Sequence, residues 1–149
     1  KINTKECLID IRIDAHIPES YIGGSAQRME MYKKISLIRT KEDHSDVFDE
    51  LTDRFGDMPR SVDRLLTIAL SKALAEDAKI TLVEERDGAI VFHIKSVRLD
   101  IWSELFDKYR GMRFAPTGDR VIFKYGSRDV TKCICEILEC YTELEKVSQ

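Results

Sequence analysis

The chain opens with a strict alternation of apolar and polar positions. Between Leu8 and Ile17, isoleucine or alanine occupies every second position, and charged or polar side chains fill the positions between them. A period of two is typical of a half-buried β-strand, so we predict a strand over residues 8–17. Pro18 has no N–H to donate and ends this strand. Gly23-Gly24 then supplies a flexible step.

Apolar residues at helical spacing dominate the next part of the chain. They predict helices over about residues 25–38, 45–55 and 61–76, the first with Ser25 as its N-cap. Gly56 stands where a helix end favours a left-handed residue, and a proline follows shortly after it. The third helix is apolar around most of its circumference, which is typical of a central, buried helix.

The second half of the chain changes from helical spacing to paired strands. Strands over 80–85 and 89–95 flank an Asp-Gly turn, and strands over 112–115 and 120–125 flank a Pro-Thr-Gly-Asp turn. Asp-Gly between two β-rich stretches is a strong hairpin signal. Helices over about 100–109 and 128–146 separate and follow these hairpins.

This order of elements predicts the α+β class: an N-terminal strand and three helices, then antiparallel hairpins with two further packed helices. A length of 149 residues suits one domain, residues 1–149, with a possible subdomain seam near 77–80. The chain starts Lys1-Ile2-Asn3-Thr4, without a methionine. We therefore expect it to be part of a larger multidomain protein.

The composition narrows the class of partner. The net charge is −3 and the isoelectric point is about 5.7. A domain that binds DNA by itself usually carries a basic face and a higher isoelectric point, so autonomous DNA binding is disfavoured. The sequence contains no stretch of about 18 apolar residues and no signal peptide. We expect a cytoplasmic protein without a membrane partner.

No motif for catalysis, cofactor binding or metal binding stands out. The sequence lacks a phosphate-binding loop, a nucleophile elbow and a zinc-binding helix motif. The cysteines lack zinc-site spacing and are expected to be buried or half-buried thiols, and the histidines are expected to be solvated. We predict no catalytic residue, cofactor or metal, although the many carboxylates leave an unrecognised hydrolase as an alternative. The cysteines are Cys7, Cys133, Cys135 and Cys140, and the histidines are His16, His44 and His93.

The segment 42–57 is rich in acids, with Arg54 as its one basic residue. Acids in the first turn of a helix are explained by the helix dipole, but Glu50 and Asp53 lie toward the negative end. With Leu51 and Phe55 turned into the core, we expect Glu50, Asp53 and Arg54 to form one exposed polar patch. An acidic patch in this position indicates a binding site for a basic partner surface.

Two stretches also carry a family resemblance. Residues 14–22 (DAHIPESYI) with 27–35 (QRMEMYKKI), and residues 50–59 (ELTDRFGDMP) with 65–69 (LLTIA), resemble the C-terminal (TRCF) domain of the bacterial transcription-repair coupling factor, Mfd. The resemblance is specific over about residues 9–79, whereas residues 80–149 match only in the order of elements. Gly23-Gly24 departs from the family pattern, which leaves the path into the first helix open.

The resemblance implies a regulatory role. Its parent is an ATP-dependent DNA translocase that removes stalled RNA polymerase and recruits excision repair. The terminal domain itself does not hydrolyse ATP. It docks on the UvrB-like N-terminal module of the same chain and masks the surface that binds UvrA, so contact with UvrA, RNA polymerase and DNA is indirect. The family motif E-L-x-D-R-F-G places Glu50, Asp53 and Arg54 at this intramolecular contact.

A second hypothesis is direct contact with DNA as an accessory domain of the same translocase. Basic residues gather around the end of the first predicted helix and are able to touch phosphates. A solvated helix face is the favoured explanation for them. These residues are Lys33, Lys34, Arg39 and Lys41.

Overall fold

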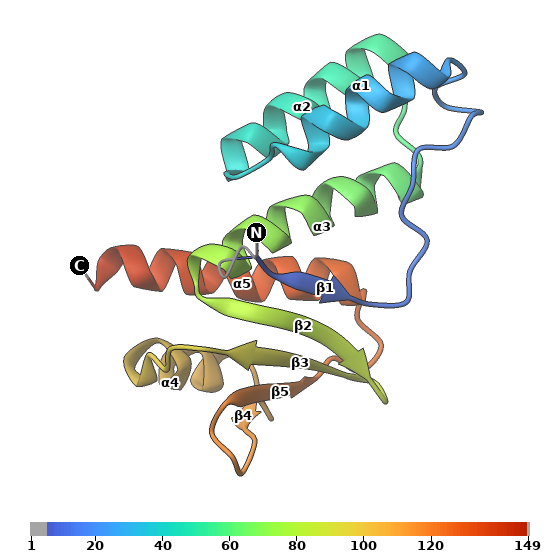
Figure 1. Ribbon diagram of the computed structural model, residues 1–149. Helices are drawn as coiled ribbons and strands as arrows, with labels where there is room; N and C mark the ends of the chain where they lie inside the picture. The colour runs from blue at the N-terminus through green and yellow to red at the C-terminus, as the bar shows by residue number, and fades with distance from the viewer. Residues whose placement is uncertain (1–5, 149) are drawn as a thin grey trace. The chain divides into compact units, whose positions relative to one another are not determined.

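The computed structural model describes residues 6–148; the first four residues, on which the expectation of a longer parent depends, lie outside this range. The chain forms two compact units (Figure 1). One comprises the chain up to Arg12 together with the chain from Leu74 onwards, and the other is Ile13–Ala73. In order, the elements are β1 (Leu8–Asp10), α1 (Ser25–Ser36), α2 (Lys41–Phe55), α3 (Arg60–Asp77), β2 (Ile80–Arg86), β3 (Ala89–Ile94), α4 (Leu99–Lys108), β4 (Arg113–Phe114), β5 (Arg120–Lys124) and α5 (Val130–Val147).

The α+β class is confirmed, with both predicted hairpins in place. The first unit contains one five-stranded sheet in the order β1-β2-β3-β5-β4. The pairs β2–β3, β3–β5 and β5–β4 are antiparallel, whereas β1 pairs with β2 in parallel. The prediction did not assign a partner to the N-terminal strand; β1 pairs in parallel at one edge because it reaches the sheet from a distant part of the sequence rather than through a hairpin.

The predicted strand over 8–17 is too long. Only Leu8–Asp10 joins the sheet, although side-chain burial keeps alternating as far as Ile17. The alternation reflects an extended backbone rather than strand pairing. At the far end of the segment, the Ile17 N–H donates to the hydroxyl of Tyr32 at 2.8 Å, a side-chain substitute for a ladder bond.

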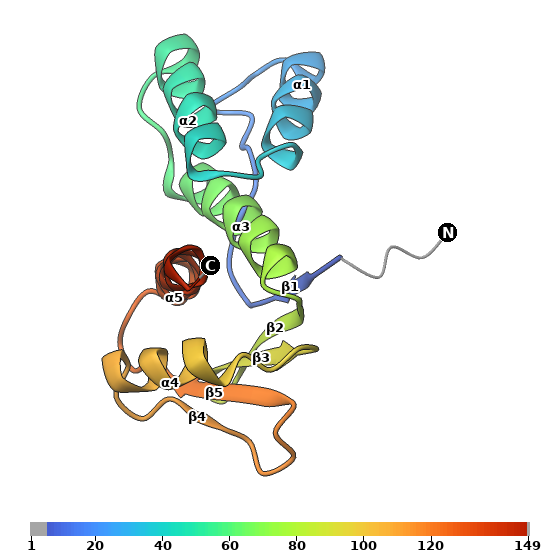
Figure 2. The same cartoon turned by 90° about the vertical axis from the view of Figure 1, so that its left-hand side faces the viewer.

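The helices α4 and α5 lie on the same side of the strands β2 and β3 (Figure 2). Trp102 of α4 lies at the centre of this core, 1% exposed. Its ring centroid is 6.0 Å from that of Phe92 in β3 and 5.3 Å from that of Tyr141 in α5. One aromatic side chain thus joins the sheet and both helices.

The helical unit is built from α1, α2 and the first part of α3. Its core residues are at most 4% exposed: Ile17, Ile22, Met31, Ile35, Ile38, Leu51, Val62, Leu66, Leu70 and Ala73. As predicted for a central helix, α3 is buried or half-buried at every position from residue 61 to residue 76, with Leu65 and Ile68 half-buried. Gly24, rather than Ser25, is the N-cap of α1, and its backbone is extended. Arg28 fixes the Gly-Gly step by donating to the carbonyls of Ile22 and Gly23 at 2.8 and 3.0 Å.

The cysteines are free thiols, buried at 7, 133 and 135 and half-buried at 140, as predicted. His16 is exposed beside Asp14, whereas His93 is half-buried and bonded to Glu84. The expectation that all histidines are solvated is therefore wrong for His93. Over residues 6–148, no helix has the length and apolar character needed to cross a membrane.

Candidate functional site: a charged surface on the α1–α2 hairpin

The helix α2 begins earlier than its apolar spacing predicted, at Lys41 instead of residue 45. Thr40 and Asp43 form a capping box: the Asp43 N–H donates to the Thr40 hydroxyl at 3.1 Å, and the Asp43 carboxylate accepts from the Thr40 N–H at 3.2 Å. The backbone N–H of Arg39, and then that of Thr40, lower the pKa of Asp43. The cap thus fixes the start of the acidic helix.

The end of α2 is fixed by Gly56 and Tyr21. Gly56 has φ 87° and ψ −162°, a region that is essentially restricted to glycine. The Tyr21 hydroxyl lies 2.9 Å from the Gly56 carbonyl and 3.1 Å from that of Leu51, and shares its proton between them. Burial, followed by the charge of Asp57, raises the pKa of Tyr21. The hydroxyl therefore stays a donor, and the family motif ends in a defined geometry.

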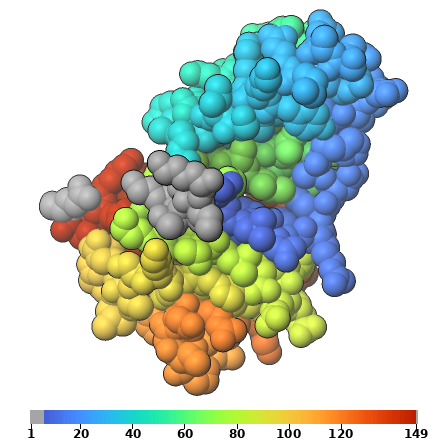
Figure 3. Space-filling view, viewed as in Figure 1, coloured from blue at the N-terminus to red at the C-terminus, as the bar shows by residue number. Residues whose placement is uncertain are grey.

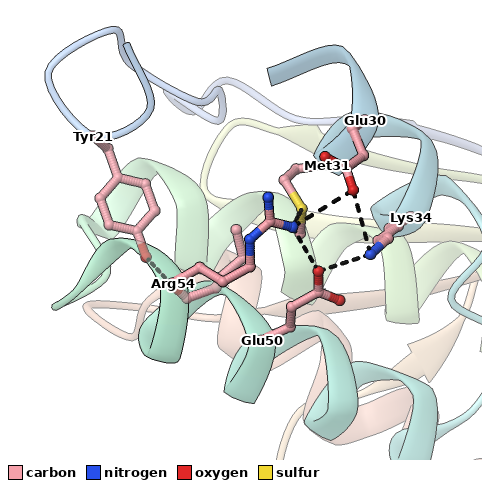
Figure 4. Close-up of polar contacts among 7 residues, drawn as sticks. Tyr21, Glu30, Met31, Lys34, Glu50 and Arg54 are labelled. Atoms are coloured by element: carbon pink, nitrogen blue, oxygen red, sulfur yellow. Dashed lines mark hydrogen bonds and ion pairs between the residues drawn. The ribbon is translucent and has the colours of Figure 1, made fainter. Parts of the chain in front are cut away.

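Four alternating charges connect α1 and α2 (Figure 4). The Glu50 Oε2 atom accepts from Lys34 Nζ at 2.7 Å and from Arg54 Nη1 at 2.8 Å. Glu30 Oε2 lies 3.6 Å from Lys34 Nζ and 3.5 Å from Arg54 Nη1. The ammonium of Lys34, and then the guanidinium of Arg54, hold the pKa of Glu50 below its usual range. We call Glu30, Lys34, Glu50 and Arg54 the ion-pair square.

Arg54 is also fixed by packing. Its guanidinium carbon lies 4.9 Å from the centroid of the Phe55 ring, and Nη1 is 3.7 Å from the sulfur of Met31. Phe55 makes an edge contact with the Tyr21 ring at a centroid distance of 6.0 Å and is half-buried. Placing Phe55 in the core was therefore wrong: it lies at the rim, where it supports Arg54.

Asp53 differs from its neighbours because it has no partner. Its side chain is exposed and makes no hydrogen bond or ion pair with any residue that the structure describes. Glu42, Asp46 and Asp49 share both properties and precede it at helical spacing, so the four acids line one side of α2. We call Glu42, Asp46, Asp49 and Asp53 the acidic stripe. No ion pair with the described part of the chain offsets the repulsion among these charges, and only Glu42 lies in the first turn, where the helix dipole favours an acid.

The predicted patch of Glu50, Asp53 and Arg54 therefore contains two kinds of residue. Glu50 and Arg54 belong to the ion-pair square, and Asp53 belongs to the acidic stripe beside it. Lys34 and Glu30 were not recognised from the sequence as part of this site. Their spacing of four on α1 was the available signal, but only the packing of α1 on α2 shows that they face Glu50 and Arg54.

Two of the basic residues considered for DNA contact are engaged within the chain. Lys34 belongs to the ion-pair square, and Arg39 donates to the carbonyl of Ala73 at 3.4 Å. Lys33 is exposed near the C-terminal end of α1, where a cation is favoured by the helix dipole. The structure thus gives these residues local roles that do not require DNA.

Replacing Asp53 by lysine should stabilise the domain by about 0.5–1.5 kcal/mol. The change removes an acid near the negative end of α2 and turns the repulsion with Asp49, four residues earlier, into an attraction. Urea unfolding followed by circular dichroism measures the effect. Asp63→Lys, in the first turn of α3, is the matched control and should destabilise. A loss of stability in Asp53→Lys would show that the residue has a stabilising contact.

Glu50→Gln should remove the pH dependence that the ion-pair square adds to stability. Because the folded-state pKa of Glu50 is lowered, its contribution is present above the usual value of 4.5 and disappears as the pH falls through the folded-state pKa. At neutral pH the variant should lose about 1 kcal/mol or less, as expected for partly exposed ion pairs. Unfolding curves for both proteins should converge in acid, and a difference that persists there would contradict this account.

The fold and this surface define a class of protein: an α+β domain that presents a charged helical hairpin. The family model that matches it is the TRCF domain, over residues 11–105. The chain belongs to the TRCF domain family.

Two named relatives support this assignment. The chain is 33% identical to the transcription-repair-coupling factor of Bacillus subtilis (strain 168) over 115 aligned residues. These residues make up 77% of this chain and 9% of that protein. It is 37% identical over 89 residues to that of Staphylococcus aureus (strain USA300), covering 60% of this chain and 8% of that protein. The chain therefore spans about a tenth of the length of these relatives.

A solved structure shares the whole fold. The crystal structure of the C-terminal domain of transcription-repair coupling factor matches with a TM-score of 0.84 at 21% identity, covering 97% of this chain and 98% of that one. The likeness includes residues 80–149, where the sequence resemblance was limited to the order of elements.

Proposed function

We propose that this domain regulates a cytoplasmic, ATP-dependent DNA translocase that couples removal of stalled RNA polymerase to excision repair. The domain is not itself catalytic. It docks on the UvrB-like N-terminal module of the same parent chain, through Glu50, Asp53 and Arg54, and masks the surface that binds UvrA. Contact with UvrA, RNA polymerase and DNA is therefore indirect. Membership of the TRCF domain family supports this role, and the charged hairpin supplies a surface for it.

The observation that carries the proposal is the unpartnered Asp53 beside a preorganised ion-pair square. Asp53 is an exposed anion that the described residues do not neutralise, at a helix end where it costs stability. Both bonds of Glu50 end on Oε2, which leaves Oε1 to accept from a partner. Arg54 is held by two carboxylates and a ring, so docking it loses little side-chain entropy.

The contact is expected to be weak between separate molecules. Exposed ion pairs contribute about 0.2–1 kcal/mol each, and desolvated interface pairs about 1.5 kcal/mol or more. Linked modules meet at effective concentrations of about millimolar, so a few kcal/mol suffice to keep a tethered clamp closed. A weak contact also suits a clamp that must open.

Competition between this domain and UvrA tests the masking. The affinity of UvrA for the isolated UvrB-like module is measured with and without an excess of this domain. Wild-type domain should weaken UvrA binding, whereas the double variant Glu50→Gln, Asp53→Lys should not. Glutamine is chosen at position 50 because a lysine there would face Lys34 and Arg54.

Asp107→Lys is the matched control, since Asp107 is also an exposed acid in the last turn of a helix, α4. It should compete like the wild type. If the wild-type domain leaves UvrA binding unchanged at saturation, masking is excluded. Equal competition by the double variant would instead remove the assigned residues from the contact.

A further inference from the structure

The sheet of the first unit has one face covered by helices and one that these helices leave uncovered. Strand register separates the two faces, because paired residues point to the same side. The covered side is identified by ring contacts with α4 and the segment that follows it: Trp102 with Phe92, Phe106 with Phe114, and Tyr109 with Phe123. We call the opposite side the open sheet face.

The centre of the open sheet face is apolar. Val91 pairs with Ile122 on one side and with Glu84 on the other, and Leu82 lies two residues before Glu84 on β2. Leu82 and Ile122 are half-buried, and Leu8 beside Leu82 on β1 is 62% exposed. In Figure 3 the side chains of β2 and β3 (yellow-green to yellow) reach the surface beside the orange segment 113–120. Val91 itself is only 7% exposed, so the apolar area that a partner can reach comes from Leu82, Ile122 and Leu8.

Positive charge gathers at the β5–β4 side of this face. Arg113 pairs directly with Ile122, and Arg120 and Lys124 are two residues before and after Ile122 on β5. Arg113 is therefore the diagonal neighbour of both Arg120 and Lys124, at about 7–8 Å across the strand pair. The three cations lie around Ile122 on one face of the sheet. Arg113 and Lys124 are exposed and form no ion pair with any residue between 6 and 148, whereas Arg120 lies 3.5 Å from Asp119.

The acids of the open sheet face lie on the other side of the apolar centre. Glu84 is bonded to His93 and lies 3.2 Å from Arg86, so its charge is satisfied within the face. Asp10 pairs with Glu84 across the parallel strands. Unpaired positive charge is therefore confined to the β5–β4 side, in a chain whose net charge is −3.

A protein segment fits this face better than nucleic acid does. Single strands bind to sheets by stacking bases on aromatic rings, and the aromatic rings of this sheet point to the covered side. Asp10, which has no ion pair within residues 6–148, would repel a phosphate backbone crossing the face. Carboxylates beside Arg113 and Lys124, with apolar side chains over Ile122 and Leu82, satisfy both the charge and the apolar surface of this face.

We propose that the open sheet face binds an acidic amphipathic segment of a partner protein. Its carboxylates pair with Arg113, Arg120 and Lys124, and its apolar side chains cover Ile122 and Leu82. This surface lies in the other unit from the acidic stripe and has the opposite charge, so it selects a different partner. The inference does not depend on the docking proposed for α2.

Nuclear magnetic resonance titration of the whole chain tests the proposal. The probe is a short synthetic peptide that alternates glutamate and valine, with its lysine–valine twin and duplex DNA as competing probes. The acidic peptide should shift amides of 82–93 and 113–124, and its affinity should fall with salt. The double variant Arg113→Glu, Lys124→Glu should bind the acidic peptide with an affinity at least about tenfold lower.

The control variant Lys33→Glu, Lys132→Glu changes two exposed cations outside the open sheet face and should bind like the wild type. Thermal melting of both variants checks that they fold, and the milder Arg113→Gln, Lys124→Gln variant should bind with intermediate affinity. Shifts elsewhere, equal binding of the reversed variant, or stronger binding of DNA to these strands would overturn the proposal. So would dimerisation that the reversal abolishes, because a second copy would then occupy the face.

Discussion

Replacing Leu51 by alanine should lower the free energy of unfolding by about 2–5 kcal/mol. Leu51 is fully buried in α2, the helix that carries the acidic stripe, and truncation leaves a cavity that the helix cannot close without moving. The Leu51 carbonyl also accepts from Tyr21, so a shift of the helix disturbs its C-terminal end. Urea unfolding followed by circular dichroism measures the loss, and docking should weaken with it.

Phe48→Ala is the matched control in the same helix. Phe48 is larger but 37% exposed, so its truncation should cost clearly less than that of Leu51. If the two variants were equally destabilised, the packing of α2 against the core of the helical unit would differ from the one described.

Trp102→Ala should have the largest effect on the sheet unit, about 3–5 kcal/mol. The side chain is 1% exposed and contacts rings from the sheet, from α4 and from α5, with centroid distances of 5.3 to 6.4 Å. Its removal takes away the ring contacts that join Phe92 of the sheet, Phe106 of α4 and Tyr141 of α5 through one side chain. Thermal and urea unfolding measure the loss, and the open sheet face should lose its peptide affinity together with the fold.

Two control substitutions test whether the loss depends on the ring at position 102 and on its burial. Trp102→Phe keeps an aromatic ring, and because the indole N–H is buried without a hydrogen-bond partner, it removes no such bond; it should cost much less than alanine. Leu99→Ala lies in the same helix but is 64% exposed and should be nearly neutral. A mild effect of Trp102→Ala would contradict its central position in this core.

Local signals predicted the β2–β3 hairpin well because a two-residue turn leaves little choice of backbone conformation. Asp87 and Gly88 have φ of 50° and 78°, the left-handed pair that an Asp-Gly hairpin turn requires. The start of α2 was missed because Thr40 and Asp43 form a capping box ahead of the apolar stripe on which the helix was recognised. Pairing of β1 with β2 joins residues far apart in sequence, and alternation alone does not specify a partner strand.

The candidate site was only partly accessible from the sequence for the same reason. The placement of Glu50, Asp53 and Arg54 on one exposed helix region follows from their spacing. The bond from Lys34 to Glu50 spans 16 residues and depends on how α1 packs on α2, which spacing does not reveal. In the structure, Glu50 and Arg54 make contacts inside the domain, whereas the Asp53 side chain has no partner among the described residues.

Calorimetric titration of this domain into the UvrB-like module, at low and moderate salt, tests the docking claim most directly. We predict binding that weakens with salt, is lost in the Glu50→Gln, Asp53→Lys variant, and is retained in Asp107→Lys. Unchanged affinity in the double variant, or no binding of the wild-type domain even at about millimolar concentration, would contradict an electrostatic contact through α2.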